Sequence, residues 1–172
     1  MNLVLIGSRG TGKSTVARLL AEKLGWPWFD ADDAIEARAG KRIAQIFADE
    51  GETAFRDWET LVIGELAARP RCVLALGGGA VVRPENRAAI GPHGTVVWLT
   101  ASPQTLWQRI QQDQSTAGRR PNLTAEGGIT EIIATLDARE AIYRQCAHLE
   151  VDTQGRTPDE VAEAILAQAK LR

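Results

Sequence analysis

The segment that most constrains the fold is Gly7–Ser14, with the sequence G-S-R-G-T-G-K-S. It matches the pattern G-x-x-x-x-G-K-[S/T], follows the apolar run Leu3–Ile6, and leads into a segment of helical period, Gly12–Leu24. In such a loop, backbone N–H groups surround phosphate oxygens, and the N-terminus of the next helix adds partial positive charge. The sequence therefore predicts a strand, a phosphate-binding loop and a helix, in that order.

The same chemistry predicts roles for individual residues of the loop. Lys13 reaches the β- and γ-phosphates of a nucleoside triphosphate, and the Ser14 hydroxyl binds Mg²⁺. The residues of this segment predicted to bind ATP are Gly10, Thr11, Gly12, Lys13, Ser14 and Thr15. For Thr15 the alternative is a hydrogen bond to local backbone, which hydroxyls at helix starts commonly make.

Short apolar runs alternate with longer segments of helical period along the chain, which is typical of a parallel sheet covered by helices on both faces. The expected strands are Leu3–Ile6, Trp26–Phe29, Cys72–Leu76, Thr95–Leu99 and Leu149–Val151. The expected helices are Gly12–Leu24, Thr53–Ala68, Pro84–Ile90, Pro103–Gln111, Thr130–Tyr143 and Pro158–Lys170. We predict an α/β fold with three α/β/α layers and a five-stranded parallel sheet, in a single domain spanning residues 1–172.

The stretch 113–128 breaks this rhythm. It is polar, it has no sustained period, and it contains Gly118, Pro121, Gly127 and Gly128. Segments of this kind form loops that are frequently functional. We therefore expect a mobile lid over residues 113–128.

Composition excludes several classes of protein. Lys and Arg number 20 against 22 Asp and Glu, and a net charge of −2 gives no indication of nucleic-acid binding. No apolar run is long enough for a membrane span or a signal peptide. Cys72 and Cys146 lack the spacing of a zinc site or a disulfide framework. We expect a cytoplasmic protein, and the lack of a long exposed apolar helix or strand favours a monomer.

The positions of the acidic residues argue against two large classes of proteins with this loop. The apolar runs 72–76 and 95–99 end in glycines and in Thr100, so neither supplies the strand-end aspartate of a mechanical ATPase. The sequence N-K-x-D, with which a GTPase recognises guanine, is absent. Acidic residues follow the second expected strand instead, at Asp30 and Asp32.

Asp30 and Asp32 are separated by one residue, and in extended backbone this spacing puts both side chains on one face. In a doubly wound sheet this strand end can lie beside the phosphate-binding loop, so one carboxylate can serve Mg²⁺ and the other a substrate hydroxyl. The alternative is helix capping, and Asp33 with Glu36 fits a capping box by itself. We therefore assign Asp33 to structure, and Asp30 and Asp32 to function.

With these residues in view, the chain resembles the shikimate kinase family, small kinases that transfer the γ-phosphoryl group of ATP to the 3-hydroxyl of shikimate. The resemblance covers nearly the whole chain and rests on ordered motifs: G-S-R-G-T-G-K-S, F-D-A-D at 29–32, F-R-x-x-E at 55–59, L-G-G-G-A at 76–80, Arg120-Pro121 and Tyr143-Arg144. It implies a place in chorismate and aromatic amino-acid biosynthesis, with Mg²⁺ as cofactor and with ATP and shikimate as the molecules bound.

The resemblance also implies roles residue by residue. Asp30 would face Mg²⁺, and Asp32 the substrate hydroxyl. Arg56 and Arg144 would bind the substrate carboxylate, in a pocket that Gly78 and Gly79 also line. The catalytic set would be Asp32, Lys13 and the lid arginine, Arg120, with Arg119 as the alternative. Arg109 and Arg156 would flank adenine and complete the ATP-binding residues together with Arg120.

Two arginines for one carboxylate agree with physical chemistry, because a planar guanidinium donates two parallel hydrogen bonds where a lysine does not. The competing interpretation of Arg56 is an ion pair with Glu59 at i, i+3 on a helix surface. Two other functions stay open. One is a kinase of similar build for gluconate or a nucleoside monophosphate, and the other is a regulatory module that binds ATP without turnover.

Overall fold

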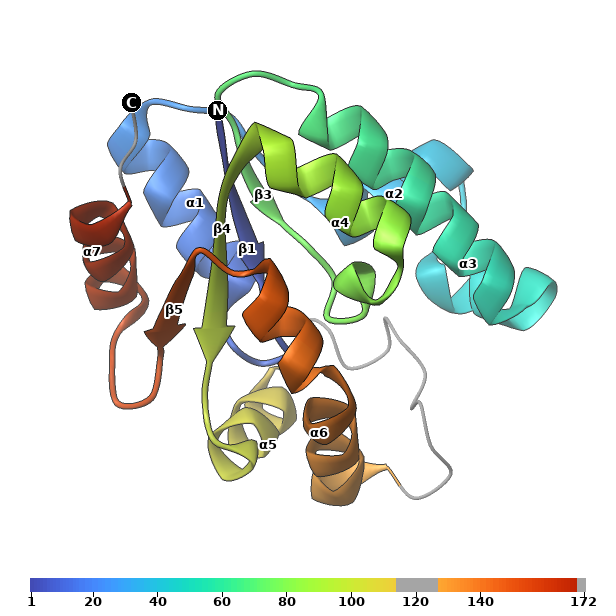
Figure 1. The fold of residues 1–172 in the computed structure, drawn as a ribbon. Helices are drawn as coiled ribbons and strands as arrows, with labels where there is room; N and C mark the ends of the chain where they lie inside the picture. The colour runs from blue at the N-terminus through green and yellow to red at the C-terminus, as the bar shows by residue number, and fades with distance from the viewer. Residues whose placement is uncertain (114–126, 170–172) are drawn as a thin grey trace.

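The computed structural model describes residues 1–113 and 127–169. One parallel sheet runs through it in the strand order β2-β3-β1-β4-β5 (Figure 1). Its strands are β1 (Asn2–Ile6), β2 (Trp28–Asp30), β3 (Val73–Ala75), β4 (Gly94–Thr100) and β5 (Leu149–Asp152). All four neighbouring pairs are parallel. The α/β class and the five-stranded parallel sheet are therefore confirmed.

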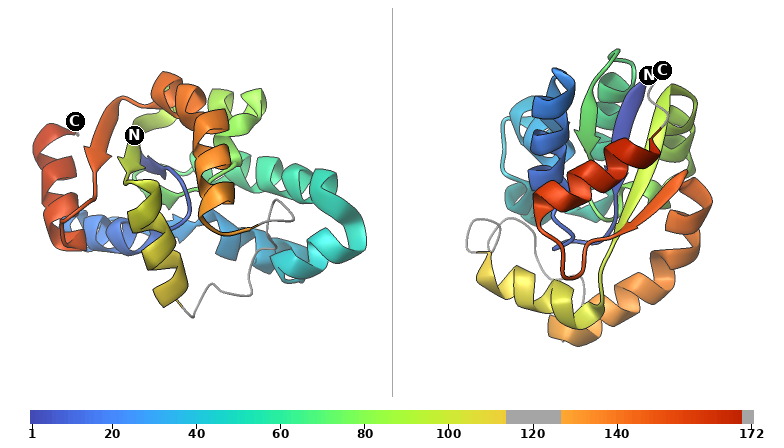
Figure 2. Two further views of the ribbon diagram at one scale, coloured as in Figure 1. Left: turned by 90° about the horizontal axis from the view of Figure 1, so that it is seen from below. Right: turned by 90° about the vertical axis from the view of Figure 1, so that its left-hand side faces the viewer.

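Helices cover both faces of this sheet. They are α1 (Lys13–Leu24), α2 (Ala31–Ala39), α3 (Ile43–Ala67), α4 (Pro84–Ile90), α5 (Pro103–Gln112), α6 (Gly128–Cys146) and α7 (Pro158–Gln168), with one-turn helices η1 (Ala80–Val82) and η2 (Gly91–His93). The ribbon views place α1 and α7 on one face, and α3, α4 and the end of α6 on the other (Figure 2). Among the described residues, no helix is both long and apolar enough to span a membrane.

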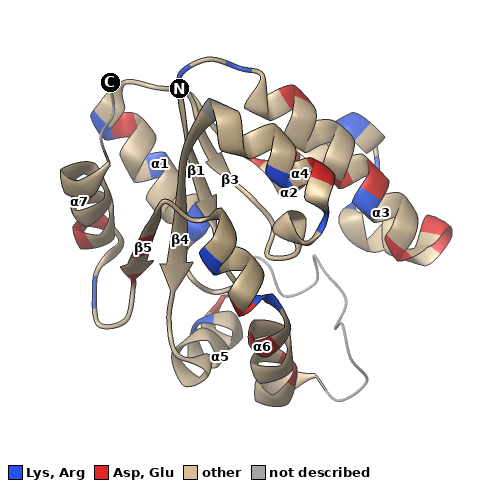
Figure 3. Ribbon diagram, in the orientation of Figure 1, with Lys and Arg blue, Asp and Glu red and all other residues tan. Residues whose placement is uncertain are grey.

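The residues of β1 show why helices cover both faces of the sheet: all five of them, Asn2–Ile6, are buried. Val4 and Ile6 join the hydrophobic core formed with α2, α3 and α4, whereas Leu3 and Leu5 pack against α1 and α7. Strands covered on both faces read as continuous apolar runs. Charged residues lie mainly on the helices, and β1, β3 and β4 contain none (Figure 3).

One helix and half of another differ from the prediction. For α2 the sequence gives only a capping box at Asp33 and Glu36, with no bounds for the helix. It starts the next helix at Thr53, whereas α3 begins at Ile43. Gly51, with φ 86° and ψ 175°, kinks α3 near its middle. Because the helical phase changes at this kink, the apolar period of the second half does not extend back into the first.

The start of α2 corrects the expected capping box. Asp30, the last residue of β2, is the N-cap, and its Oδ1 accepts a hydrogen bond from the Asp32 backbone N–H at 2.9 Å. Asp33 lies in the first turn, and Glu36 Oε1 accepts instead from the Ile43 backbone N–H at 3.0 Å. The box at Asp33 and Glu36 is therefore wrong, because the helix begins at Ala31, before Asp33 could cap it.

Two neighbouring strands create the crevice in which ligands of such folds bind. β1 lies beside β3, and the loops that leave their carboxyl ends lead to helices on opposite faces of the sheet, α1 and α4. In doubly wound sheets the ligand crevice forms where successive connections diverge in this way. The phosphate-binding loop follows β1, and Gly77–Gly79 follows β3.

Candidate active site

The phosphate-binding loop has the backbone that its glycines predict. Gly7 and Gly12 have φ of 136° and 87°, in a region that side-chain-bearing residues rarely adopt. A Cβ atom on Gly7 would lie 2.4 Å from the carbonyl oxygen of Leu99. Lys13 Nζ donates hydrogen bonds to the carbonyl oxygens of Gly7 and Ser8, both at 2.8 Å. The lysine therefore lies across its own loop.

A pocket opens beside this loop, and we call it the nucleotide pocket. It is lined by Arg9, Gly10, Gly12, Lys13, Ser14, Thr15, Asp30, Asp32, Leu76, Gly77, Gly78, Arg109, Ile110 and Asp113. The structure thus gathers most of the predicted loop residues with both aspartates. Thr11 does not line this pocket; its side chain is buried, and Oγ1 donates to the Ser8 carbonyl oxygen at 2.9 Å.

Ser14 and Asp30 lie together in the nucleotide pocket, where the Ser14 hydroxyl donates to Asp30 Oδ2. Burial raises the pKa of the Asp30 carboxyl, the nearby charges of Asp32 and Asp33 act in the same direction, and the Ser14 hydrogen bond opposes them. Within residues 1–113 and 127–169, no group of three His, Cys, Asp or Glu side chains could hold a metal. Mg²⁺ commonly takes only one or two protein oxygens and completes its shell with phosphates and water. The oxygens of Ser14 and Asp30 fit that ion.

Asp32 reaches the same pocket by a different route from the expected one. Asp30 is extended, but Asp32 already lies in the first turn of α2. The chain turns from strand to helix between them, so the shared direction of the two carboxylates does not come from two extended residues. Both carboxylates line one pocket, as predicted, but the turn from β2 into α2 brings them there, and not the alternation of an extended strand.

Arg109 joins α5 to the loop after β5. Its Nη1 donates to Thr153 Oγ1 at 2.8 Å and to the Gly10 carbonyl oxygen at 3.3 Å, and its Nη2 donates to the Thr153 carbonyl oxygen at 2.9 Å. Arg156 lies exposed in the same loop and is not among the residues that line the nucleotide pocket. Arg119 and Arg120 lie outside the described residues, as does most of the predicted lid; α6 already begins at Gly128.

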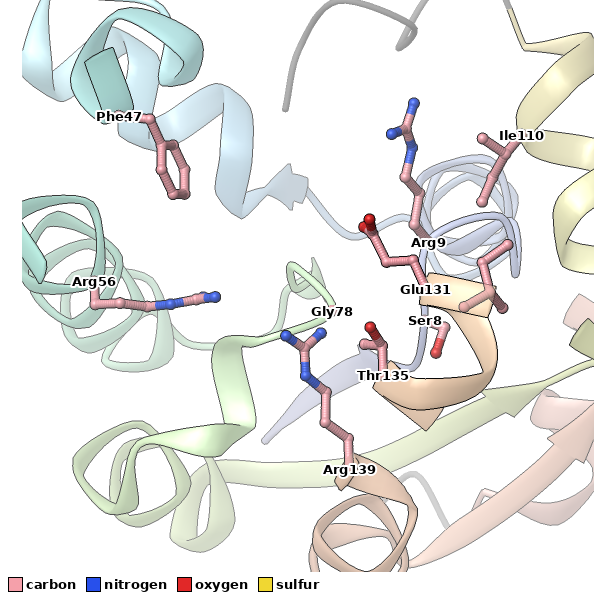
Figure 4. Close-up of a pocket in the computed structure, with 10 residues that line it drawn as sticks. Ser8, Arg9, Phe47, Arg56, Gly78, Ile110, Glu131, Thr135 and Arg139 are labelled. Carbon is pink, nitrogen blue, oxygen red and sulfur yellow. The ribbon is translucent and has the colours of Figure 1, made fainter. Parts of the chain in front are cut away.

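A second pocket adjoins the first, and we call it the arginine pocket. Its lining residues are Ser8, Arg9, Phe47, Arg56, Gly78, Ile110, Glu131, Ile132, Thr135 and Arg139. Figure 4 shows the guanidinium groups of Arg56 and Arg139 extending into it from α3 and α6. Two cations from separate helices thus converge on one small space beside the nucleotide pocket.

Arg56 makes the expected ion pair with Glu59, but within the protein instead of on its surface. Nη1 lies 2.7 Å from Glu59 Oε2, and the two side chains are 12% and 1% exposed. The guanidinium also lies 5.2 Å from the ring centroid of Phe55. The pair therefore holds Arg56 in place while its guanidinium still lines the pocket, so the structural and functional interpretations are compatible.

The two glycines after β3 have different surroundings. Gly78 lines both pockets, and its carbonyl oxygen accepts a hydrogen bond from the Tyr143 hydroxyl. Gly79 lines neither of them. A Cβ on Gly79 would lie 2.5 Å from Nη2 of Arg56. Gly79 therefore leaves room for the arginine, which corrects its expected position in the wall of the pocket.

Arg144 is not brought to the pocket. Its side chain is 65% exposed, its Nη2 lies 2.8 Å from Glu140 Oε1, and its guanidinium carbon is 5.8 Å from the Trp98 ring centroid. Arg139 lines the pocket instead. Five residues turn a helix by about 500°, so the two side chains leave α6 about 140° apart. The signal that identifies Arg139 is its spacing of four from the buried Tyr143, which puts both on one helix face.

Comparison with known sequences points to one family. The family model described as shikimate kinase matches residues 9–170. A shikimate kinase of Rhodopirellula baltica is 46% identical over 168 residues, which cover 98% of this chain and 90% of the relative. One of Burkholderia thailandensis is 41% identical over 171 residues, covering 99% and 91%.

Comparison with solved structures agrees. The shikimate kinase from Acinetobacter baumannii in complex with shikimate matches with a TM-score of 0.91 and 37% identity, covering 99% of this chain and 95% of that one. A gluconokinase from Sinorhizobium meliloti matches with a TM-score of 0.58 at 20% identity. The second likeness shows a shared fold and nothing about the acceptor.

Proposed function

Because the chain belongs to the shikimate kinase family, it is an ATP-dependent kinase of shikimate in aromatic biosynthesis, and we propose here how its own residues perform the transfer to the 3-hydroxyl. The observation that carries the proposal is the pairing of two adjoining pockets. One contains the phosphate-binding loop, and the other contains two convergent arginines. A phosphoryl donor and an anionic acceptor would thus meet between them.

Arg56 and Arg139 bind the substrate carboxylate in this proposal, with Arg139 in the role first expected of Arg144. Charge-assisted hydrogen bonds from a planar guanidinium are strong and directional, and they suit a small anion in a partly buried site. Glu59 orients Arg56 through their 2.7 Å ion pair. Gly79 acts through Arg56 because it leaves the space that the guanidinium occupies.

Asp32 orients the 3-hydroxyl and accepts its proton as the oxygen attacks the γ-phosphorus. The new oxygen–phosphorus bond forms while the bond to the β,γ-bridging oxygen breaks, and that electron pair leaves on ADP. Position and electrostatic stabilisation supply most of the catalysis in such transfers. Asp32 lines the nucleotide pocket, which shares Gly78 with the arginine pocket, and this position supports the role.

The loop residues Gly10, Gly12, Lys13, Ser14 and Thr15, which line the nucleotide pocket, bind the phosphates of ATP. Thr11, whose side chain is buried, contributes to this binding through its backbone. Ser14 and Asp30 would hold Mg²⁺, which, when bound, neutralises charge on the β- and γ-phosphates. Arg109, tied to Thr153 and Gly10, and Arg156 flank the adenine. Arg120, in the predicted lid, contacts the phosphoryl group together with Lys13. The same proposal includes a monomer in the cytoplasm. The free thiols of Cys72 and Cys146 agree with a reducing compartment.

Release of ADP from Mg²⁺·ATP tests the acceptor directly. We expect release with shikimate, and none above background with gluconate, AMP, CMP or no acceptor. Chelation of Mg²⁺ with EDTA abolishes the release in the wild-type protein, and excess Mg²⁺ restores it. Release with gluconate or a nucleotide in place of shikimate would contradict the roles of Arg56 and Arg139, whereas no release with any acceptor would favour a binding module.

A further inference from the structure

Arg9 is the charged side chain at the junction of the two pockets, and none of the roles proposed for Asp32, Arg56 and Arg139 involves it. Among the described residues, Arg9, Gly78 and Ile110 line both the nucleotide pocket and the arginine pocket. Of these three only Arg9 carries a charge. It is the third residue of the phosphate-binding loop, and it is half-buried.

The backbone holds Arg9 at this junction from two sides. On one side, a Cβ on Gly78 would lie 3.6 Å from the backbone nitrogen of Arg9, so the loop after β3 lies close to it. On the other, the adjacent Gly10 packs on α5, since a Cβ there would lie 3.1 Å from the Leu106 carbonyl oxygen and 3.2 Å from Ile110 Cγ1. The stem of Arg9 therefore starts from a closely packed segment.

The direction of the Arg9 side chain separates it from the other two arginines. Figure 4 shows it on the side of the arginine pocket where Ile110 lies, whereas Arg56 and Arg139 extend into the pocket from two other sides, from α3 and α6. Arg56 and Arg139 do not line the nucleotide pocket, and Arg9 does. The acceptor carboxylate therefore has its own pair of cations, and Arg9 lies at the end where the phosphoryl group enters.

We propose that Arg9 is a catalytic residue whose guanidinium contacts the phosphoryl group while it passes from ATP to the acceptor. In that step the acceptor oxygen bonds to the γ-phosphorus, the bond to the β,γ-bridging oxygen breaks with its electron pair on ADP, and the hydroxyl proton leaves to Asp32. Charge spreads over the equatorial phosphoryl oxygens, and a guanidinium can donate to two of them at once. This inference rests on the proposed function, because it requires a phosphoryl group to cross between the pockets.

The test compares Arg9→Met, which keeps a long side chain without the charge, with Arg18→Met. Arg18 is a matched control because it lies on α1, is exposed and pairs with Glu22 at i, i+4. With both substrates saturating, kcat of Arg9→Met is expected to fall about 100-fold, the scale of one lost transition-state donor. KM for shikimate and the dissociation constant of ADP change less than about threefold. Arg18→Met keeps the wild-type constants, and Arg9→Lys recovers part of kcat.

A second readout uses a mimic of the transferring group, aluminium fluoride bound with ADP and shikimate. Arg9→Met is expected to weaken the binding of this mimic by the same factor as kcat and to leave ADP binding unchanged. Equal weakening of the mimic and of ADP would overturn the proposal and show that Arg9 shapes the loop. A raised KM for shikimate with wild-type kcat would overturn it in favour of acceptor binding, and unchanged kinetics would leave Arg9 without a role.

Two controls separate this inference from other failures. The thermal unfolding midpoint of Arg9→Met is expected to match that of the wild type, since the side chain is half-buried and not part of either hydrophobic core. If the wild-type protein itself fails to phosphorylate shikimate, the proposed function is contradicted. If the wild type is active and Arg9→Met is equally active, only the inference about Arg9 fails.

Discussion

The nucleotide pocket and the arginine pocket are built in different ways. Residues 12–15 of the nucleotide pocket are contiguous in the chain. Its two aspartates come from the end of β2, at Asp30, and from the first turn of α2, at Asp32. The arginine pocket takes Arg56 from α3, Gly78 from the loop after β3 and Arg139 from α6. A contiguous loop has a geometry that its glycines largely determine, whereas a pocket assembled from distant helices depends on the rotation of each helix.

This difference explains which assignments the sequence supports. A shift of one residue along a helix rotates the assigned side chain by about 100°, so an arginine motif near the end of α6 does not identify the arginine that faces the site. The phosphate-binding loop has no comparable freedom. Substitutions in the two pockets should therefore affect different kinetic constants.

Asp32→Asn is expected to have the largest effect. Loss of the group that accepts the hydroxyl proton should lower kcat about 100- to 10,000-fold, the usual contribution of general acid–base catalysis. The affinity for ADP should stay within about twofold, because the amide is isosteric and the loop is unchanged. Steady-state kinetics and calorimetric titration of ADP check both parts. Unchanged turnover would remove Asp32 from the chemistry.

Arg139→Met and Arg144→Met compare two arginines of one helix. Hydrogen bonds to a charged group contribute about 1.5–3 kcal/mol, so Arg139→Met should raise KM for shikimate about 10- to 100-fold and leave KM for ATP unchanged. Arg144 is exposed and pairs with Glu140, so Arg144→Met should change neither constant by more than about twofold. The reverse result would restore the assignment first made from the sequence.

Gly79→Ala tests whether the space beside Arg56 matters. The new methyl group would displace the Arg56 guanidinium, which lies 2.5 Å from the position of its Cβ, and KM for shikimate should rise about tenfold. Gly64→Ala is the matched control, since nothing lies within 4 Å of its Cβ in α3. It should leave both KM values unchanged and stabilise the fold by about 0.5–1 kcal/mol. Equal kinetics for the two variants would contradict the role of Gly79.

Tyr143→Phe is expected to have the smallest effect of the series. It removes the hydrogen bond to the Gly78 carbonyl oxygen and keeps the ring stacked on Trp98. The loss should cost about 1 kcal/mol and lower the thermal unfolding midpoint by about 2–4 °C. Since Gly78 lines both pockets, the two KM values should rise together and only slightly. A rise confined to shikimate would show that Gly78 serves one pocket only.

The sequence predicts the sheet well because its strands are short, apolar and buried on both faces. The bounds of α4 agree residue for residue, since Pro84 marks its first turn. Prediction fails at the start of α2, because its N-cap is Asp30, a residue that the sequence analysis assigned to Mg²⁺ binding. It also fails at the first half of α3, because the kink at Gly51 changes the helical phase.

The site follows the same division. Predictions for Lys13, Ser14, Asp30 and Asp32 place them in one pocket, as the structure does. The sequence did not predict that Arg139 lines the arginine pocket, because its spacing of four from Tyr143 is informative only once the structure shows that Tyr143 is buried. It did not predict the position of Arg9, because only the fold brings its loop to the junction of the two pockets. The predicted lid and its arginine, Arg120, stay predictions.

The most direct test of the account compares shikimate with its methyl ester, in which the carboxylate has no charge, on the wild-type protein and on Arg139→Met. The wild type is expected to have a KM about 10- to 100-fold lower for shikimate than for the ester. In Arg139→Met this preference is expected to disappear largely, with kcat for both acceptors close to the wild-type value. An unchanged preference in the variant would contradict the arginine pocket as the carboxylate site.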